Sequence, residues 1–114
     1  MNQSYSQPLP ADTIAIWKQV FGRQRAFALH AFDQLDDAQF FAILAPGLNS
    51  CAIIANHLAG NMLSRWTEFL TTDGEKPNRN REAEFDLPAE HSADERAKIM
   101  ERFEQGWSIL FAAL

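Results

Sequence analysis

The sequence has a single cysteine among its 114 residues, so Cys51 has no partner for a disulfide within the chain. One cysteine suits a reducing compartment, and we expect the protein in the cytoplasm. Basic residues are also few, with 10 Lys and Arg against 15 Asp and Glu and a net charge of −5, and they do not cluster. This charge balance argues against nucleic acid or an anionic membrane as the main partner.

Long apolar runs are missing as well. No stretch approaches the roughly 20 apolar residues that a membrane-spanning helix needs. The first ten residues, MNQSYSQPLP, have neither a basic start nor an apolar core, so they do not resemble a secretory signal. With 46% hydrophobic and 22% charged residues and no internal repeat, the composition is that of one globular domain over residues 1–114.

Helical periodicity dominates what is present, so the expected fold class is all-α. Apolar stripes predict three long amphipathic helices over about residues 11–34, 50–70 and 92–114. Asp12 is the expected N-cap of the first helix, and either residue of the Asn49–Ser50 pair can cap the second.

Two capping-box patterns add detail. Asp36 with Gln39 predicts a short helix after the first long one, and Ser92 with Glu95 opens the last long helix. Residues 71–91 form a long polar connection between the second and third long helices. Such a connection is longer than usual in a helical bundle, and long loops in compact domains are often functional.

The apolar stripe of the last helix continues to Leu114, with no glycine and no basic residue in its final turn. We therefore expect an up-down bundle of three long helices and a short one, in which the place of a fourth bundle helix is open. An open groove of this kind exposes apolar surface, which favours a homodimer.

Residues 49–69, NSCAIIANHLAGNMLSRWTEF, combine an apolar half with a polar seam at spacings of four, three and four residues: His57, Asn61, Ser64 and Glu68. Wheel geometry alone favours a solvated back of the helix. The alternative is the wall of a polar cavity, with His57 as a metal ligand or an acid–base group. Gln24, which interrupts the apolar stripe of the first helix, is a second candidate for a cavity wall.

Two further features have competing readings. Cys51 falls on the apolar side of its helix, which favours a buried structural cysteine over a reactive thiol. The long connection carries Lys76, Arg79 and Arg81 among acidic residues. Arginines beside a cavity can clamp a carboxylate or a phosphate, whereas a self-neutralising surface loop is the commoner arrangement.

The stretch NSCAIIANHLAGNMLSRWTEFLTTDGEKPNRNREAEF, residues 49–85, resembles the DinB/YfiT-like superfamily of four-helix bundles, and specifically an uncharacterised bacterial branch of it. The similarity extends over about residues 14–111. The resemblance implies an up-down-down-up bundle that holds a divalent metal, often zinc or nickel, with three histidines. Members with known activity include thiol-dependent transferases and isomerases that use a low-molecular-weight thiol.

By this resemblance His57 matches the metal ligand of the second helix. Asn61 and Arg65 match positions of the branch's motif that have no assigned role, and we expect both to line the cavity. The family's other two ligands form an H-x-x-x-H pair in the last helix, and this sequence contains no such pair. His30 and His91 do not replace it, because His30 lies on the outer face of the first helix and His91 precedes the third. In such a bundle the histidine of the second helix points inward, so the resemblance favours the interpretation of the polar seam as a cavity wall.

Two functions are compatible with these observations. The first is a DinB-like metal-dependent enzyme, a thiol-linked transferase or hydrolase with an incomplete metal site, in which His57 is one ligand of zinc or nickel and a small thiol takes part. The second is a non-catalytic helical module that binds a small ligand or a protein partner. Metal binding that His57→Ala abolishes would favour the first.

Overall fold

The computed structural model describes residues 11–72, 74–77, 79–84 and 92–114, and this part of the chain is all-helical without a strand. Three long helices and two short ones follow one another: α1 (Ala11–Asp33), α2 (Asp37–Phe41), α3 (Cys51–Trp66), α4 (Arg81–Glu84) and α5 (Ala93–Ala113). The three long helices and α2 were predicted, and α4 was not. None of the helices described is long and apolar enough to cross a membrane.

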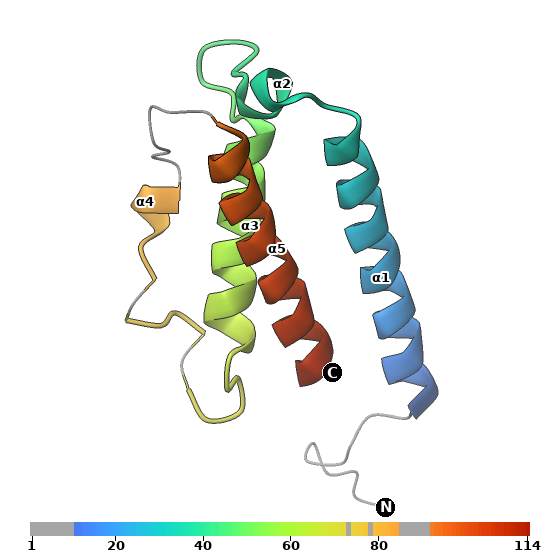
Figure 1. Cartoon of the computed structure of the whole chain (residues 1–114). Coiled ribbons are helices and arrows are strands. Elements are labelled where there is room, and N and C mark those ends of the chain that lie inside the picture. The colour runs from blue at the N-terminus through green and yellow to red at the C-terminus, as the bar shows by residue number, and fades with distance from the viewer. Residues whose placement is uncertain (1–10, 73, 78, 85–91) are drawn as a thin grey trace, which may run out of the picture.

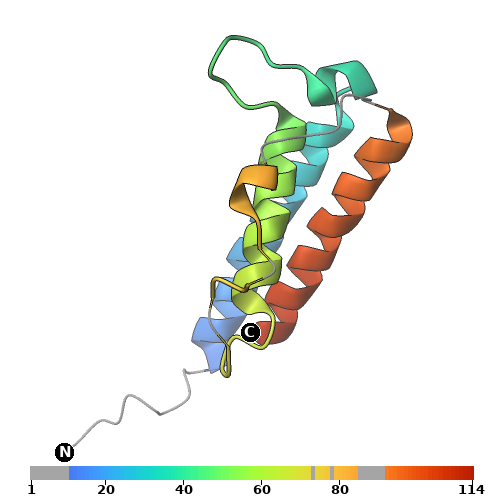
Figure 2. The same cartoon turned by 90° about the vertical axis from the view of Figure 1, so that its left-hand side faces the viewer.

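The long helices differ in direction (Figure 1). The helix α1 runs opposite to α3 and α5, which run the same way. Two neighbouring helices with the same direction cannot be joined by a tight turn, so the chain after α3 has to travel back along that helix before α5 begins. We call the described part of this connection, residues 67–72, 74–77 and 79–84, the return segment. It lies against α3 on the side away from α1 (Figure 2).

The closest helix pair is α3 and α5. Gly106 allows this approach, because a Cβ atom added there would lie 3.0 Å from the side chain of Met62. Aromatic rings extend the core to the other helices: Phe32 of α1 meets Phe103 edge-on at 5.7 Å between ring centroids. The buried apolar side chains of this core are Phe32, Phe40, Phe41, Ala52, Ile53, Ala55, Ala59, Met62, Ile99, Phe103, Trp107 and Leu110.

The helix α1 packs less closely than its apolar stripe predicted. Phe32 is its only residue classed as buried, and four large apolar side chains are exposed: Ile16, Trp17, Val20 and Phe27. Two polar contacts hold α1 to α5. Arg25 forms an ion pair with Glu104 at 2.6 Å, and Arg96 donates to the carbonyl oxygen of Phe32 at 2.7 Å.

Local capping explains where several helices begin. The side chain of Asp36 accepts from the amide of Gln39 at 2.8 Å, and Gln39 Oε1 accepts from the amide of Asp36 at 2.9 Å, which confirms the capping box of α2. Ser50 is the N-cap of α3, and the hydroxyl of Ser92 accepts from the amide of Glu95 at 3.2 Å to cap α5.

One predicted cap and one predicted boundary were wrong. The helix α1 begins at Ala11, as predicted, so Asp12 lies within its first turn rather than at the N-cap. The helix α3 ends at Trp66 instead of continuing to Leu70. Thr67 is extended there (φ −70°, ψ 116°) and Glu68 takes the left-handed conformation (φ 48°), a conformation that commonly terminates helices.

Candidate functional site

The return segment lies on three residues of α3 that follow one another at a spacing of four: Asn56, Gly60 and Ser64. We call these three residues the contact stripe. A spacing of four keeps them on one face of the helix, and all three are buried. A buried amide and a buried hydroxyl require hydrogen-bond partners. The return segment supplies all of those described below except one, which comes from α5.

Ser64 fixes the first part of the return segment. Its hydroxyl donates to the carbonyl oxygen of Gly74 at 2.6 Å and accepts from the backbone amide of Lys76 at 3.0 Å. The ammonium group of Lys76 donates in turn to the carbonyl oxygen of Ser64. That carbonyl belongs to the last turn of α3, where no further helical amide is available to pair with it. One serine therefore joins the end of α3 to residues 74–76.

Glu84 fixes the other end. The backbone carbonyl oxygen of Glu84 accepts from the side-chain amide of Asn56 at 3.1 Å. Glu84 is 5% exposed. The carboxylate lies directly against Gly60, because a Cβ atom added at that position would be 1.7 Å from Glu84 Oε2. Only glycine leaves room for this carboxylate at the surface of α3.

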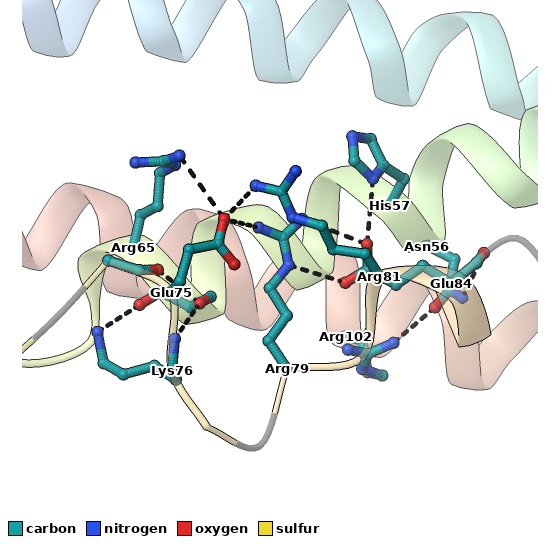
Figure 3. A network of polar contacts seen from close by, with 11 residues as sticks. Asn56, His57, Arg65, Glu75, Lys76, Arg79, Arg81, Glu84 and Arg102 are labelled. Carbon is teal, nitrogen blue, oxygen red and sulfur yellow. Dashed lines mark hydrogen bonds and ion pairs between the residues drawn. The ribbon is translucent and has the colours of Figure 1, made fainter.

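Arg79 neutralises the buried carboxylate (Figure 3). Its Nε lies 3.2 Å from Glu84 Oε2 and its Nη2 lies 3.3 Å from Oε1, so the two groups pair through two hydrogen bonds. The side chains of Arg79 and Glu84 are 3% and 6% exposed. Arg79 also reaches Glu75 at 3.4 Å. Paired geometry of this kind compensates for the cost of removing both charges from water.

His57 approaches the same carboxylate from another side (Figure 3). Its Nδ1 lies 3.1 Å from Glu84 Oε1, and the imidazole is 37% exposed. A zinc site needs about three protein ligands. Within the residues that the structure describes, no group of three His, Cys, Asp or Glu side chains is arranged to hold a metal ion. The described residues therefore do not fit the three-ligand metal site that the resemblance implies.

A cavity of about 590 Å³ opens between α3, α5 and the return segment. The contact stripe forms one wall, and Lys76, Arg79, Asn80 and Glu84 of the return segment form another. Arg102 closes it from α5, and Leu63 with Thr67, Glu68 and Thr72 lines the end near the C-terminus of α3. Among the residues that line the cavity, Leu63 is apolar and Gly60 has no side chain, and the others have polar side chains.

Arg102 is oriented by the contact stripe. Its Nη1 donates to Asn56 Oδ1 at 2.6 Å (Figure 3). Asn56 thus uses its carbonyl oxygen for Arg102 and its amide for Glu84, so both ends of this side chain are occupied. One buried asparagine connects α3, α4 and α5.

Some residues that the sequence singled out meet at this cavity and others do not. Ser64, Glu68 and Arg79 line it. Asn61 is half-buried and is not among the lining residues. Gln24 lies on α1 and is exposed, so its side chain is not a wall of this cavity.

The other candidates lie outside the cavity. Arg65 and Arg81 are about half exposed, and both pair with Glu75, Arg65 at 3.8 Å. Cys51 is half-buried and packs against the core, and His30 is exposed on α1. His91 lies outside the described residues.

Sequence reasoning missed four residues that build the site: Asn56, Gly60, Glu84 and Arg102. The spacing of Asn56, Gly60 and Ser64 was a usable signal, since a small residue between two polar ones on one helix face indicates a close approach by another segment. No local pattern could indicate Glu84 as the residue that approaches, because it lies 28 residues beyond its partner Asn56.

The model of a family described as "Protein of unknown function (DUF1572)" matches residues 11–114. No curated protein and no solved structure matches the chain.

Proposed function

The chain belongs to the DUF1572 family of proteins of unknown function, and we propose from its own residues that it binds a small polar molecule in the cavity between α3, α5 and the return segment. The observation that carries this proposal is the cavity itself. Its volume of about 590 Å³ is within the usual range of small-molecule sites. Most of the residues that line it carry polar side chains, which can form hydrogen bonds with a ligand.

The walls of the cavity support the proposal because contacts among their own residues hold them in place. Ser64, Asn56 and the Arg79–Glu84 pair are all buried and hydrogen-bonded. A wall that is already ordered loses little conformational entropy when a ligand binds, which favours affinity.

A metal-dependent, thiol-linked transferase or hydrolase is the other candidate. One observation favours it: the Glu84 carboxylate orients the imidazole of His57, an arrangement common behind metal-ligating histidines. The resemblance to DinB-like bundles also speaks for it, since α1 runs one way and α3 and α5 the other, the order of the first three helices of such a bundle. We rank it second because His57 and Glu84 supply fewer ligands than a zinc site requires.

A screen of small polar molecules by ligand-observed NMR tests the binding function. We expect ligands of the wild-type protein to be lost in Leu63→Trp, which fills the cavity from α3. The matched control is Leu58→Trp, which adds the same ring to α3 at an exposed position outside the lining. A screen without ligands, or ligands that Leu63→Trp retains, would contradict the proposal.

Titration with zinc and nickel salts tests the second candidate. We expect the isolated monomer to bind either metal weakly, because His57 is a single imidazole ligand. A tight one-to-one complex that His57→Ala abolishes would instead favour the metal-dependent enzyme.

A further inference from the structure

Arg102 differs from the other cations in the cavity wall. Arg79 is paired with Glu84 and Glu75, and the ammonium group of Lys76 donates to the carbonyl oxygen of Ser64. Arg102 lines the same cavity, yet its only polar contact among the described residues is with the neutral side chain of Asn56. Its positive charge therefore has no acidic partner in the part of the chain described.

One hydrogen bond orients the guanidinium group of Arg102, a residue that is exposed overall. A guanidinium has five N–H donors in one plane, and the contact with Asn56 at 2.6 Å uses one of them. Asn56 is 9% exposed and is itself fixed through Glu84. An arginine that is oriented by a neutral acceptor keeps donors for a carboxylate or phosphate, which it recognises through two parallel hydrogen bonds.

The acidic residues of the cavity do not cancel this charge. Glu84 is already paired with Arg79 and contacts His57. Glu68 lies past Trp66, the last residue of α3. At a rise of 1.5 Å per residue, Trp66 is about 15 Å from Asn56 along the helix axis. Over such a distance in water, salt largely screens the interaction of two charges.

From this geometry we propose that the cavity is an anion site, in which Arg102 binds the carboxylate or phosphate group of a small polar ligand. The inference rests on the proposed binding function and specifies the chemistry of the ligand. The anionic group lies at the end of the cavity next to Asn56 and Arg102, and the remainder of the ligand lies along the polar wall towards Ser64.

Two probes test the anion site: inorganic phosphate and succinate, each titrated at constant ionic strength with sodium chloride as the balancing salt. The readout is the side-chain Nε–Hε signal of Arg102 and the backbone amides of α3 in heteronuclear NMR spectra. We expect saturable shifts with at least one probe, and the tighter probe identifies a phosphate or a carboxylate as the preferred group. Arg102→Gln is expected to weaken that binding at least tenfold.

The matched control is Lys98→Gln, which removes the same charge from α5 at a side chain that is 72% exposed and outside the cavity lining. It should leave the affinity unchanged. Arg102→Lys keeps the charge but not the planar pair of donors, so intermediate affinity is expected. Circular dichroism and thermal melting check that each variant is folded.

Two results would overturn the inference. Equal weakening by Arg102→Gln and Lys98→Gln would mean that the anions respond to overall charge. Absence of saturable binding by either probe would exclude an anion site at Arg102. If the wild type then still bound uncharged ligands that Leu63→Trp loses, the binding function would stand while the anion site failed; if no ligand bound at all, both would fail.

Discussion

At the scale of single residues, the site depends on a buried carboxylate and on the absence of a side chain opposite it. Glu84 has its charge paired by Arg79 and its space provided by Gly60. Neither condition is sufficient alone, because an unpaired buried charge is costly and a paired one still needs room. Substitutions at the two positions therefore separate the steric requirement from the electrostatic one.

Gly60→Ala tests the steric requirement. The added methyl group would lie 1.7 Å from Glu84 Oε2, so the carboxylate has to leave its place and the Arg79 pair is disturbed. Although alanine is the better helix former, we expect a net loss of about 1–3 kcal/mol in the free energy of unfolding, measured by urea denaturation.

Gly22→Ala is the matched control, since it lies within α1 and a Cβ atom there meets nothing within 4 Å. It should stabilise the protein by up to about 1 kcal/mol. Equal effects of the two substitutions would show that Glu84 does not lie against Gly60.

Glu84→Gln tests the electrostatic requirement. The substitution keeps the size of the side chain but leaves the guanidinium of Arg79, 3% exposed, with only the partly exposed Glu75 as an acidic partner among the described residues. We expect a loss of about 3 kcal/mol in the free energy of unfolding at neutral pH.

Glu75→Gln makes the same change in a carboxylate that is 46% exposed, and it should cost below about 1 kcal/mol. If Glu84→Gln were as mild as this control, the pair of Arg79 and Glu84 would not be a buried ion pair in solution.

At the scale of elements, the direction of the helices explains the return segment. Because α3 and α5 run the same way (Figure 1), the chain between them has to cover the length of α3. The described residues of this segment belong mainly to polar types, and hydrogen bonds to α3 hold it: Ser64 near one end and Asn56 near the other. The cavity is thus a consequence of the path by which the chain returns.

The turn at the end of α3 contains a residue in an unfavourable backbone conformation. Glu68 has φ 48°, a conformation that favours glycine. Glu68→Gly should therefore stabilise the protein by about 0.5–1 kcal/mol, with thermal unfolding as the measurement. Glu68→Ala removes the same carboxylate and keeps the strained backbone, so it should not stabilise. Stabilisation by alanine equal to that by glycine would mean that the carboxylate, and not the backbone, is the unfavourable feature.

At the scale of the whole molecule, α1 is the least covered helix. Phe32 is its only buried residue. Three more of its side chains are partly buried against the core: Phe21, Ala28 and Leu29. Four large apolar side chains of the helix are exposed: Ile16, Trp17, Val20 and Phe27. Contiguous apolar surface on a soluble protein commonly marks an interface. Twofold homodimers are the commonest assembly, so we propose that a second copy of the chain covers this face.

Sedimentation equilibrium at micromolar concentration tests the dimer. We expect a reversible dimer that Phe27→Asp, at a side chain 69% exposed, shifts towards the monomer. Leu44→Asp introduces the same charge at an apolar side chain that is 89% exposed but lies after α2, and it should leave the association unchanged. A stable wild-type monomer across this concentration range would contradict the proposal.

Most of the local structure could be predicted from the sequence. The capping residues Asp36, Ser50 and Ser92 act on amides within three residues of themselves, and apolar periodicity needs only neighbouring residues to be visible. The end of α3 was missed because the competing turn depends on a left-handed residue, Glu68, whose type does not signal that conformation.

The sequence by itself determined an all-helical chain, its long helices and a polar seam on α3, because these features depend on residues close together along the chain. Only the tertiary structure decided which residues of α3 face the return segment. That segment covers Ser64 of the seam but not Asn61, and it also covers Asn56 and Gly60, which lie outside the seam. It brings Glu84 into contact with Asn56, which lies 28 residues earlier in the chain. Arg102 joins from α5 across a separation of 46 residues. Contacts over such separations depend on the path of the chain, and a helix wheel carries no information about that path.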